Sequence, residues 1–288
     1  MMNGVIVIDK PKGKTSHDIV GLMRKKFGTR KVGHTGTLDP LATGVLPICI
    51  GNATRASDML LSADKKYCAE LILGKRSDTL DITGEITEEK EIKVTEEEIR
   101  SVILSFIGEQ DQIPPMYSAI KKDGKKLYEM AREGIEIERE PRRINIFQIE
   151  IKDITLPKVI IDVHCSKGTY IRSLCDDIGR KLGCGAIMSE LRRTYTGGFS
   201  IDDAYTLEEL DNTDDIQGTL KPTDTLFSDL PAIYLNKKQE TSVTNGVRMT
   251  WRKGIEGQRY RVYGEDGRFL CISQIKDMRL VLIKSFWT

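Results

Sequence analysis

The sequence predicts an α+β fold with a mixed sheet and flanking helices, followed by a small β-rich domain. Strand-like and helix-like segments follow each other irregularly, without the strand–helix–strand repeat of a parallel-sheet protein. The chain has 288 residues, which is enough for about two domains. An acidic stretch at about 202–230, in which we expect a short helix and a linker, separates them. We therefore divide the chain into residues 1–230 and 231–288.

The chain is expected to begin with a strand and a helix. Residues 4–8 (GVIVI) form an apolar run that is typical of a buried strand. Apolar side chains then recur at helical spacing up to Phe27, so we expect a helix that Ser16 caps and Gly28 ends. The glycine-rich residues 28–44 show no apolar period and are expected to form a long loop, and such loops are usually functional or disordered.

Further strands and helices follow from local patterns. Pro47 suggests an edge strand or a bend, because proline cannot donate to a sheet. Thr95 and Glu98 form a capping box, and Gly183 ends an amphipathic helix. We expect strands at 45–50, 67–73, 144–151 and 159–165, and helices at 95–107 and 171–182. The last part contains three strand-like runs, RYRVYG, RFLCISQI and RLVLIKSFW, as in a small β-rich domain of about 58 residues.

Several classes of protein are excluded by what the sequence lacks. No run approaches the roughly 18 apolar residues of a membrane span, and the first residues do not read as a signal peptide, so we expect a cytoplasmic protein without a membrane partner. The six cysteines form no C-x-x-C pair and there are three histidines, which argues against a metal site. No dinucleotide or phosphate-loop motif is present, so we expect no cofactor.

Charge is distributed in blocks, although the net charge is only +1. Residues 10–31 contain eight basic side chains and one acid, and the segment from Lys237 to the end contains eleven basic and five acidic ones. Residues 85–98 and 202–215 are acidic. Blocks of this kind suit a protein that binds a polyanion on one face. Taken alone, they are more often simply solvated faces.

The loop at 32–44, VGHTGTLDPLATG, has the composition of a site. Asp39 precedes a proline, which biases its backbone toward an extended conformation, and His34 lies five residues upstream. Glycines on both sides allow close approach of a ligand. A lone Asp-Pro pair usually marks only a turn. This loop, however, follows the most basic stretch of the chain and is too long for a bare turn.

The loop resembles, almost residue for residue, the catalytic loop of bacterial tRNA pseudouridine(55) synthases, the TruB family. The similarity continues through IDKPKGKTSHD (8–18), KKYCAELILGKRSDTLDITG (65–84), QIPPMYSAIKKDGKKLYEMAREG (112–134), CSKGTYIRSL (165–174) and GCGAIMSELRRTYTGGF (183–199). It covers roughly 1–230, while 231–288 resembles a short PUA-type RNA-binding domain much more weakly. The resemblance implies a pseudouridine-synthase-type mixed sheet and a β-barrel-like C-terminal domain.

The resemblance also implies an activity, the isomerisation of uridine to pseudouridine at position 55 in the TΨC arm of transfer RNA. This reaction moves the base from a nitrogen to a carbon linkage and imports no group, which agrees with the absence of cofactor motifs. The insertion at 112–134 is similar to that of the stand-alone bacterial type, so no guide RNA is expected. The protein is expected to be a monomer that binds the TΨC stem-loop.

Residue roles are carried over from the family. Asp39 corresponds to the nucleophile, and a carboxylate of reference pKa near 3.9 is already ionised at neutral pH. Tyr67 corresponds to the tyrosine that stacks on the base and helps to take a proton from it, although by position alone it would be a core aromatic. Arg172 is implied to pair with Asp39, and Tyr170 would share its face if the backbone there is extended.

Other residues are implied in binding. The substrate-binding set comprises His34, which takes part in displacing the uridine, with Tyr67, Asp81, Tyr170 and Leu191. The candidates for contact with the RNA backbone are Lys10, Lys121, Lys122, Lys125, Arg132 and Arg192. Without the family, His34 would be an ordinary loop histidine.

Two other functions remain open at this point. A non-catalytic RNA-binding or tRNA-folding protein would need the basic surfaces but not an Asp39–Arg172 pair. A guide-dependent synthase would be active only inside a ribonucleoprotein. Activity of the purified chain on bare transcript distinguishes these possibilities.

Overall fold

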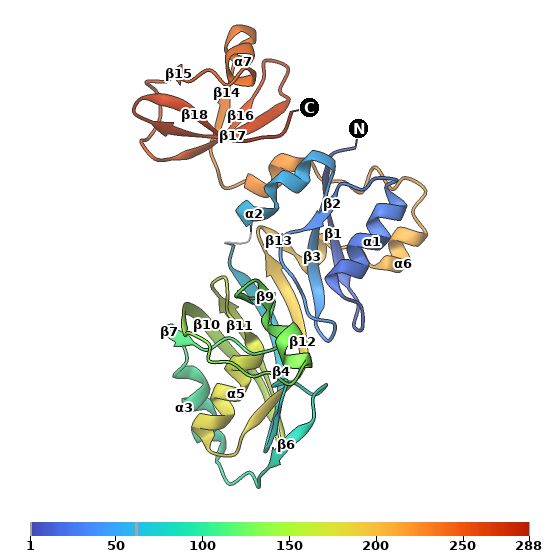
Figure 1. Ribbon diagram of the computed structural model, residues 1–288, viewed down its shortest axis with the longest axis vertical. Coiled ribbons are helices and arrows are strands. Elements are labelled where there is room, and N and C mark those ends of the chain that lie inside the picture. Colours follow the sequence, from blue (N-terminus) through green and yellow to red (C-terminus); the bar gives the residue numbers. More distant parts are fainter. Residues whose placement is uncertain (1, 61–62, 288) are drawn as a thin grey trace.

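The computed structural model describes residues 2–60 and 63–287. Figure 1 shows an elongated, bent molecule in which a small C-terminal sheet forms the upper lobe and one large sheet runs through the other two lobes. Within the described residues the large sheet has nine strands, in the order β1-β3-β12-β4-β11-β10-β7, with β2 paired to β3 and β13 to β12. No helix in this part of the chain is long and apolar enough to cross a membrane.

The bounds of the elements are as follows. The large sheet contains β1 (Gly4–Lys10), β2 (Val32–His34), β3 (Thr43–Ile50), β4 (Lys65–Leu73), β7 (Gly108–Gln112), β10 (Arg142–Thr155), β11 (Lys158–Cys165), β12 (Ala186–Thr196) and β13 (Phe199–Ser200). Two hairpins are formed by β5 (Lys75–Ser77) with β6 (Ile86–Glu89) and by β8 (Lys121–Lys122) with β9 (Lys125–Lys126). The C-terminal sheet contains β14 (Ala232–Tyr234), β15 (Met249–Thr250), β16 (Arg259–Tyr263), β17 (Phe269–Lys276) and β18 (Arg279–Ser285). The α-helices are α1 (Ser16–Lys26), α2 (Ser57–Leu60), α3 (Glu96–Leu104), α4 (Leu127–Arg132), α5 (Ile171–Leu182), α6 (Leu207–Asp211) and α7 (Lys237–Thr244), and the 3-10 helices are η1 (Gly51–Ala56), η2 (Ile201–Asp203) and η3 (Thr223–Phe227).

The large sheet is mixed, as the sequence predicts. β12 pairs parallel with β3 through Arg192↔Thr43 and Arg193↔Gly44, and antiparallel with β4. Gly44 lies in the left-handed region at φ +98°, and a Cβ there would stand 2.2 Å from the carbonyl oxygen of Arg193. Only glycine allows this close approach, which joins the two halves of the sheet beside the Asp39 loop.

Helices α1, α3 and α5 pack their apolar stripes against the large sheet. Ile19 and Met23 of α1, Ile103 of α3, and Leu174 and Ile178 of α5 are each at most 1% exposed in one continuous core. Burial of an aliphatic side chain of this size contributes roughly 1.5–3 kcal/mol, so the sheet and its helices form a rigid platform for the loops between them.

The C-terminal sheet packs on the first strands of the chain. Val5 of β1 and Val45 of β3 share a buried cluster with Ile272 and Phe286 of the C-terminal part. The side-chain amide of Asn52 donates to the carbonyl of Phe286 at 3.1 Å. The five-stranded sheet fits the small β-barrel-like domain of the prediction.

The structure corrects several local predictions. The N-cap of α1 is Thr15, which forms a capping box with Asp18, and Ser16 is the first helical residue. β3 is not an edge strand, because β1 pairs along one side of it and β2 and β12 pair along the other. The carbonyl of Pro47 accepts from Thr35, so its nitrogen faces the same side. On this side the nitrogen of Pro47 lies between the stretch of β3 that pairs with β2 and the stretch that pairs with β12. A backbone N–H donor is therefore not needed at Pro47.

Other boundaries also differ from the prediction. The helix predicted at 95–107 ends at Leu104, and the long loop contains the short strand β2. The three strand-like runs of the last part correspond to β16, β17 and β18. Helix α7 and the two short strands of the C-terminal sheet are absent from the prediction, since their segments are too short and polar to show a clear period.

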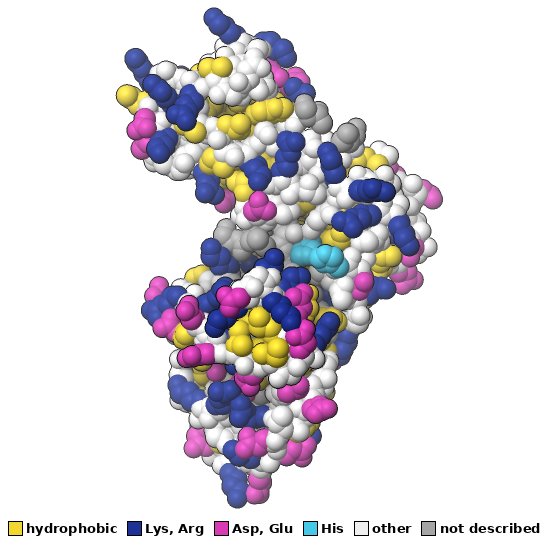
Figure 2. Space-filling model, in the orientation of Figure 1, with side chains coloured by type: hydrophobic (Ala, Val, Ile, Leu, Met, Phe, Trp, Pro, Cys, Tyr) yellow, Lys and Arg dark blue, Asp and Glu magenta, His cyan; other side chains and the backbone are white. Residues whose placement is uncertain are grey.

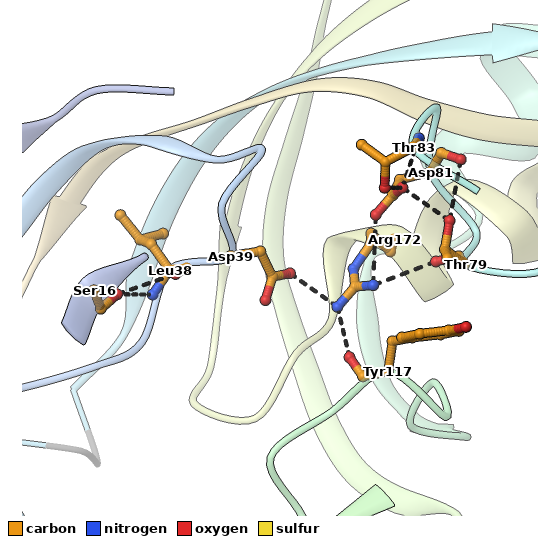
Figure 3. A network of polar contacts seen from close by, with 8 residues as sticks. All are labelled: Ser16, Leu38, Asp39, Thr79, Asp81, Thr83, Tyr117 and Arg172. Atoms are coloured by element: carbon orange, nitrogen blue, oxygen red, sulfur yellow. Dashed lines mark hydrogen bonds and ion pairs between the residues drawn. The ribbon is translucent and has the colours of Figure 1, made fainter. Parts of the chain in front are cut away.

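Ser16 fastens the Asp39 loop to α1. Its hydroxyl donates to the carbonyl of Leu38 at 3.0 Å and accepts from the amide of Leu38 at 2.9 Å, and the side chain is 2% exposed. Figure 3 shows this reciprocal pair directly beside Asp39.

Substitution Ser16→Ala should leave both backbone groups of Leu38 buried without a partner, at a cost of about 1–3 kcal/mol in the free energy of unfolding. Urea denaturation measures this cost. The control Ser101→Ala, at an exposed position of α3, should change stability by less than about 0.5 kcal/mol. Equal effects of the two substitutions would show that the Leu38 contact does not hold the loop.

Candidate active site

Asp39 and Arg172 form an ion pair at the junction of the two halves of the large sheet. The Oδ2 atom of Asp39 lies 2.8 Å from Nη2 of Arg172. Asp39 belongs to the loop between β2 and β3, and Arg172 is the second residue of α5. The arginine side chain is 7% exposed and the aspartate side chain 43% exposed. The carboxylate is therefore held from the protein side and remains open to a substrate.

The guanidinium of Arg172 has three further partners (Figure 3). Nη1 lies 3.5 Å from Oδ2 of Asp81 and donates to the carbonyl of Thr79 at 3.3 Å, while Nη2 donates to the carbonyl of Tyr117 at 2.8 Å. A planar guanidinium with several fixed acceptors cannot turn freely. Its orientation toward Asp39 is thus set by two other segments of the chain.

Asp81 is held rigidly in the loop that follows β5. One carboxylate oxygen, Oδ1, accepts from the hydroxyl of Thr79 at 2.9 Å and from the amide and hydroxyl of Thr83 at 2.9 and 2.5 Å. The other oxygen faces Arg172, and the residue is 4% exposed. Leu80 adopts a left-handed φ of +64°, a strained conformation that the loop maintains beside the site. Asp81 therefore holds the guanidinium of Arg172 through Nη1, while Nη2 contacts Asp39.

Tyr67 and Tyr170 lie near the ion pair. The charge of Asp39 acts on both phenols, and burial raises the pKa of each. Tyr67 lies in β4 and Leu191 in the adjacent β12, and both are less than 9% exposed. Tyr170 has extended backbone at the N-cap of α5, but Arg172 is already helical. The condition under which the two residues would share one extended face is therefore not met.

Gln112 positions the start of α5. Its side-chain amide donates to the carbonyl of Tyr170 at 3.1 Å, and its side-chain oxygen accepts from the Tyr170 amide at 2.8 Å. Gln112 ends β7 and is the first residue of the insertion, so one buried side chain links the start of the insertion to the helix that carries Arg172. No local pattern in the sequence indicates this role, nor those of the carbonyls of Thr79 and Tyr117.

His34 lies at the end of β2, with its ring centroid 6.0 Å from that of His17. Figure 2 shows histidine side chains at the surface of the waist between the lobes. Burial, followed by His17 and Arg193, lowers the pKa of His34, so its ring is neutral at pH 7. Its Nδ1 atom is buried without a hydrogen-bond partner among the described residues. This atom is therefore an unsatisfied polar group of the resting site.

Lys10, a predicted candidate for contact with the RNA backbone, is not accessible in this structure. It is 0% exposed, and its ammonium donates to the carbonyls of Pro11, Lys14 and Pro40 at 3.0, 2.6 and 3.5 Å. Burial lowers the pKa of Lys10 to about 8, although Asp39 opposes this shift. The sequence shows that Lys10 lies in a basic stretch. It does not show that Lys10, at the end of β1, reaches the carbonyl of Pro40 in the Asp39 loop.

The other backbone candidates are accessible to different degrees. Lys121, Lys122 and Arg132 are exposed, and Lys125 is half-buried and paired with Glu133. Arg192 is 40% exposed and forms an ion pair with Asp9 at 2.6 Å. Among the described residues no group of three or more His, Cys, Asp or Glu side chains is placed to hold a metal ion.

Comparison with known families gives two matches along the chain. The family described as TruB family pseudouridylate synthase (N terminal domain) matches residues 24–171. The family described as tRNA pseudouridylate synthase B C-terminal domain matches residues 172–228, which precede the C-terminal sheet.

Individual relatives agree with these families. A protein named tRNA pseudouridine synthase B from Alkaliphilus oremlandii (strain OhILAs) is 54% identical over 86% of this chain and 83% of its own length. A protein of the same name from Clostridium kluyveri is 44% identical over 99% of this chain and 100% of its own. Among solved structures, the chain is similar to one in a Cbf5-Nop10-Gar1 complex, with 28% identity, a TM-score of 0.75 and coverage of 99% of this chain and 85% of that one.

The lowered pKa of Lys10 predicts a pH dependence of stability. Between pH 8 and about 10.5 the unfolded chain binds more protons at Lys10 than the folded chain does, so folded-state stability gains from rising pH. The stability difference between the wild type and Lys10→Met should therefore shift in favour of the wild type as pH rises through this window. The proteins share all other titrating groups, so urea denaturation at pH 7, 8, 9 and 10 isolates Lys10. A stability difference that does not change with pH would contradict the lowered pKa of the buried Lys10 ammonium.

Proposed function

This chain belongs to the TruB family of pseudouridylate synthases, and on that premise we propose that it converts uridine 55 in the TΨC arm of transfer RNA into pseudouridine, with Asp39 as the nucleophile. The chain is a tRNA pseudouridine synthase, an isomerase of uridine in tRNA. The roles of individual residues and the choice of the TΨC arm are the proposed part. The observation that supports them is the Asp39–Arg172 ion pair.

The reaction exchanges one bond to the sugar for another. The bond between C1′ and N1 of uracil breaks, the base turns in its pocket, a bond forms between C1′ and C5, and the hydrogen at C5 leaves as a proton while N1 gains one. Arg172 keeps the Asp39 carboxylate oriented for this sequence, because a charge-assisted contact fixes one of its oxygens. The exposure of Asp39 allows the nucleoside to reach it.

The base has to leave its stack before it meets Asp39. Extruding a base costs a few kcal/mol, and stacking on an aromatic side chain returns about 1–3 kcal/mol. Tyr67, Tyr170 and Leu191 would supply the pocket for the extruded uracil, and the half-buried ring of His34 would contact the RNA at its mouth. Tyr67 would then help to take the proton from C5.

The insertion at 112–134 would grip the RNA arm. Lys126 and Arg132 lie 5.2 and 5.4 Å from the ring centroid of Tyr128, and Lys121 and Lys122 are exposed on the adjoining hairpin. Such side chains neutralise phosphates and position RNA without reading its sequence. The contact from Arg172 to the carbonyl of Tyr117 joins the insertion to the proposed active site and supports this role.

We propose that the chain acts alone, as a cytoplasmic monomer. Structural relatives occur in guide-type particles, including an H/ACA RNP bound to a substrate RNA that matches with a TM-score of 0.76 and 27% identity over 99% of this chain and 85% of that one. The relatives named tRNA pseudouridine synthase B are more similar in sequence, and the match to one of them covers both chains nearly completely. The division at residues 230 and 231, with the C-terminal sheet as a PUA-like RNA-binding domain, belongs to the same proposal.

Substitution Asp39→Asn should abolish pseudouridine formation and leave the affinity for tRNA within about threefold, because the amide cannot act as nucleophile but fills the same space. Tritium release from tRNA labelled at C5 of uracil measures the reaction, and filter binding measures affinity. The control Asp78→Asn, at an exposed position of the neighbouring loop, should retain activity. Near-normal release by Asp39→Asn would end its assignment.

Substitutions Lys121→Met and Lys122→Met should each weaken tRNA binding and reduce the slope of log affinity against log salt by roughly 0.7–0.9 for every phosphate that the variant no longer neutralises. The matched control is Lys93→Met, because this lysine is 76% exposed and lies away from the insertion. Binding would be measured between about 50 and 200 mM salt. If the control changes the slope as much as the insertion variants do, the insertion lysines are not the groups that bind the phosphates of the RNA.

A further inference from the structure

Arg193 is a buried arginine for which the described residues supply no carboxylate partner. It lies in β12, is 1% exposed, and donates to the carbonyl of Val45 at 2.7 Å and to that of Gly36 at 3.1 Å. Buried charges are normally paired, because taking an ion out of water is costly. Two carbonyl dipoles do not carry a full negative charge. The charge of this guanidinium is thus not neutralised by any described carboxylate, and it favours an anionic form of a neighbouring group.

The phenol of Tyr67 lies beside this guanidinium. Tyr67 of β4 and Arg193 of β12 are direct partners in the antiparallel register, so their side chains leave the same face of the sheet. The two groups act on each other's pKa. In a hydrogen bond between them the guanidinium could only donate, so the phenol oxygen would be the acceptor. Tyr67 is 7% exposed, so the contact is largely shielded from water.

We propose that Arg193 is a positioning residue of the reaction, which holds the Tyr67 oxygen in place and stabilises it as a phenolate that takes the proton from C5. This role of Arg193 rests on that of Tyr67 in the proposed function. In this step the bond between C5 and its hydrogen breaks, its electrons restore the uracil ring, and the proton joins the phenolate oxygen. The phenol later returns that proton to water.

Each group of the pair acts on the other against the effect of burial. Burial raises the pKa of Tyr67, and Arg193 opposes the rise. Burial lowers the pKa of Arg193, and Tyr67 opposes that fall. Each group therefore favours the charged form of the other. The other titratable groups that act on the pair, from the Asp39 loop and from β11, β1, β2 and β4, are Asp39, Cys165, Lys10, His34 and Lys65.

Arg193 also binds the chain on both sides of Asp39. Gly36 and Val45, whose carbonyls it binds, lie on either side of Asp39 in the chain. One guanidinium therefore connects the loop of the nucleophile to the strand of the tyrosine. A purely structural clamp would need the same contacts, and the test has to separate the two roles.

The test measures single-turnover pseudouridine formation against pH in the full chain carrying Arg193→Met, Arg193→Lys, Tyr67→Phe, or Arg193→Met with Tyr67→Phe. We expect Arg193→Met to lower the rate at pH 7 at least about tenfold, with tRNA affinity within about threefold, and Arg193→Lys to recover part of it. The rate of Arg193→Met should rise to its plateau at higher pH than that of the wild type. In the Tyr67→Phe background, Arg193→Met should cost less than about threefold.

Replacing Tyr67 with a fluorotyrosine, whose phenol is more acidic, should restore most of the rate that Arg193→Met removes. A structural clamp would not respond to this change. Failure of the fluorotyrosine to restore the rate, or a wild-type rate in Arg193→Met, would overturn the proposal for Arg193 alone. A wild-type rate in Tyr67→Phe would instead overturn the role of Tyr67 in the proposed function, and the role of Arg193 with it.

A second measurement does not depend on the folding of Arg193→Met. In the chain with Arg193 intact and fluorotyrosine at position 67, the guanidinium proton resonances of Arg193 should titrate together with the fluorine resonance of the phenol. Guanidinium resonances that ignore this titration would show that the contact transmits no charge, and would overturn the proposal.

Discussion

The guanidinium of Arg172 is the point at which three separate segments of the chain meet. It binds Asp39 from the loop before β3, Asp81 and the carbonyl of Thr79 from the loop after β5, and the carbonyl of Tyr117 from the insertion. Each segment alone is a surface loop that would be free to move. The buried cation removes that freedom, because removal of any one partner would leave charge or dipole unpaired in a low-dielectric environment. The geometry at Asp39 is therefore a consequence of folding and not of the loop's own sequence.

The site is built from more buried positive charge than negative charge. Lys10 and Arg193 lie beneath the Asp39 loop and are at most 1% exposed, and the described hydrogen bonds of their side chains go to carbonyls. Such cations stabilise the fold less than apolar side chains of the same size would. Their positive potential suits a polyanionic substrate. The fold thus exchanges some stability for an electrostatic environment that the chemistry uses.

The sequence predicts the repetitive parts of the fold well and the site only in part. Helix α5 appears at its predicted residues because its apolar stripe and Gly183 are local signals. The ion pair between Asp39 and Arg172, which the resemblance implies, is present in the structure, but periodicity alone could not join residues so far apart in the chain. The burial of Lys10 could not be predicted, because a basic residue at the end of a strand looks the same in sequence whether it faces solvent or carbonyls. The contributions of Gln112 and of the Tyr117 carbonyl depend on tertiary packing, which no local pattern records.

Substitution Arg172→Lys tests the central claim most directly, because it keeps the positive charge and removes the planar fork that reaches all its partners at once. The measurement is the single-turnover rate of pseudouridine formation at saturating enzyme, alongside tRNA affinity. We predict that the rate falls about a hundredfold or more, with affinity within about threefold. A lysine variant that reacts within a few-fold of the wild type would show that the fixed geometry of this guanidinium is not what the site depends on.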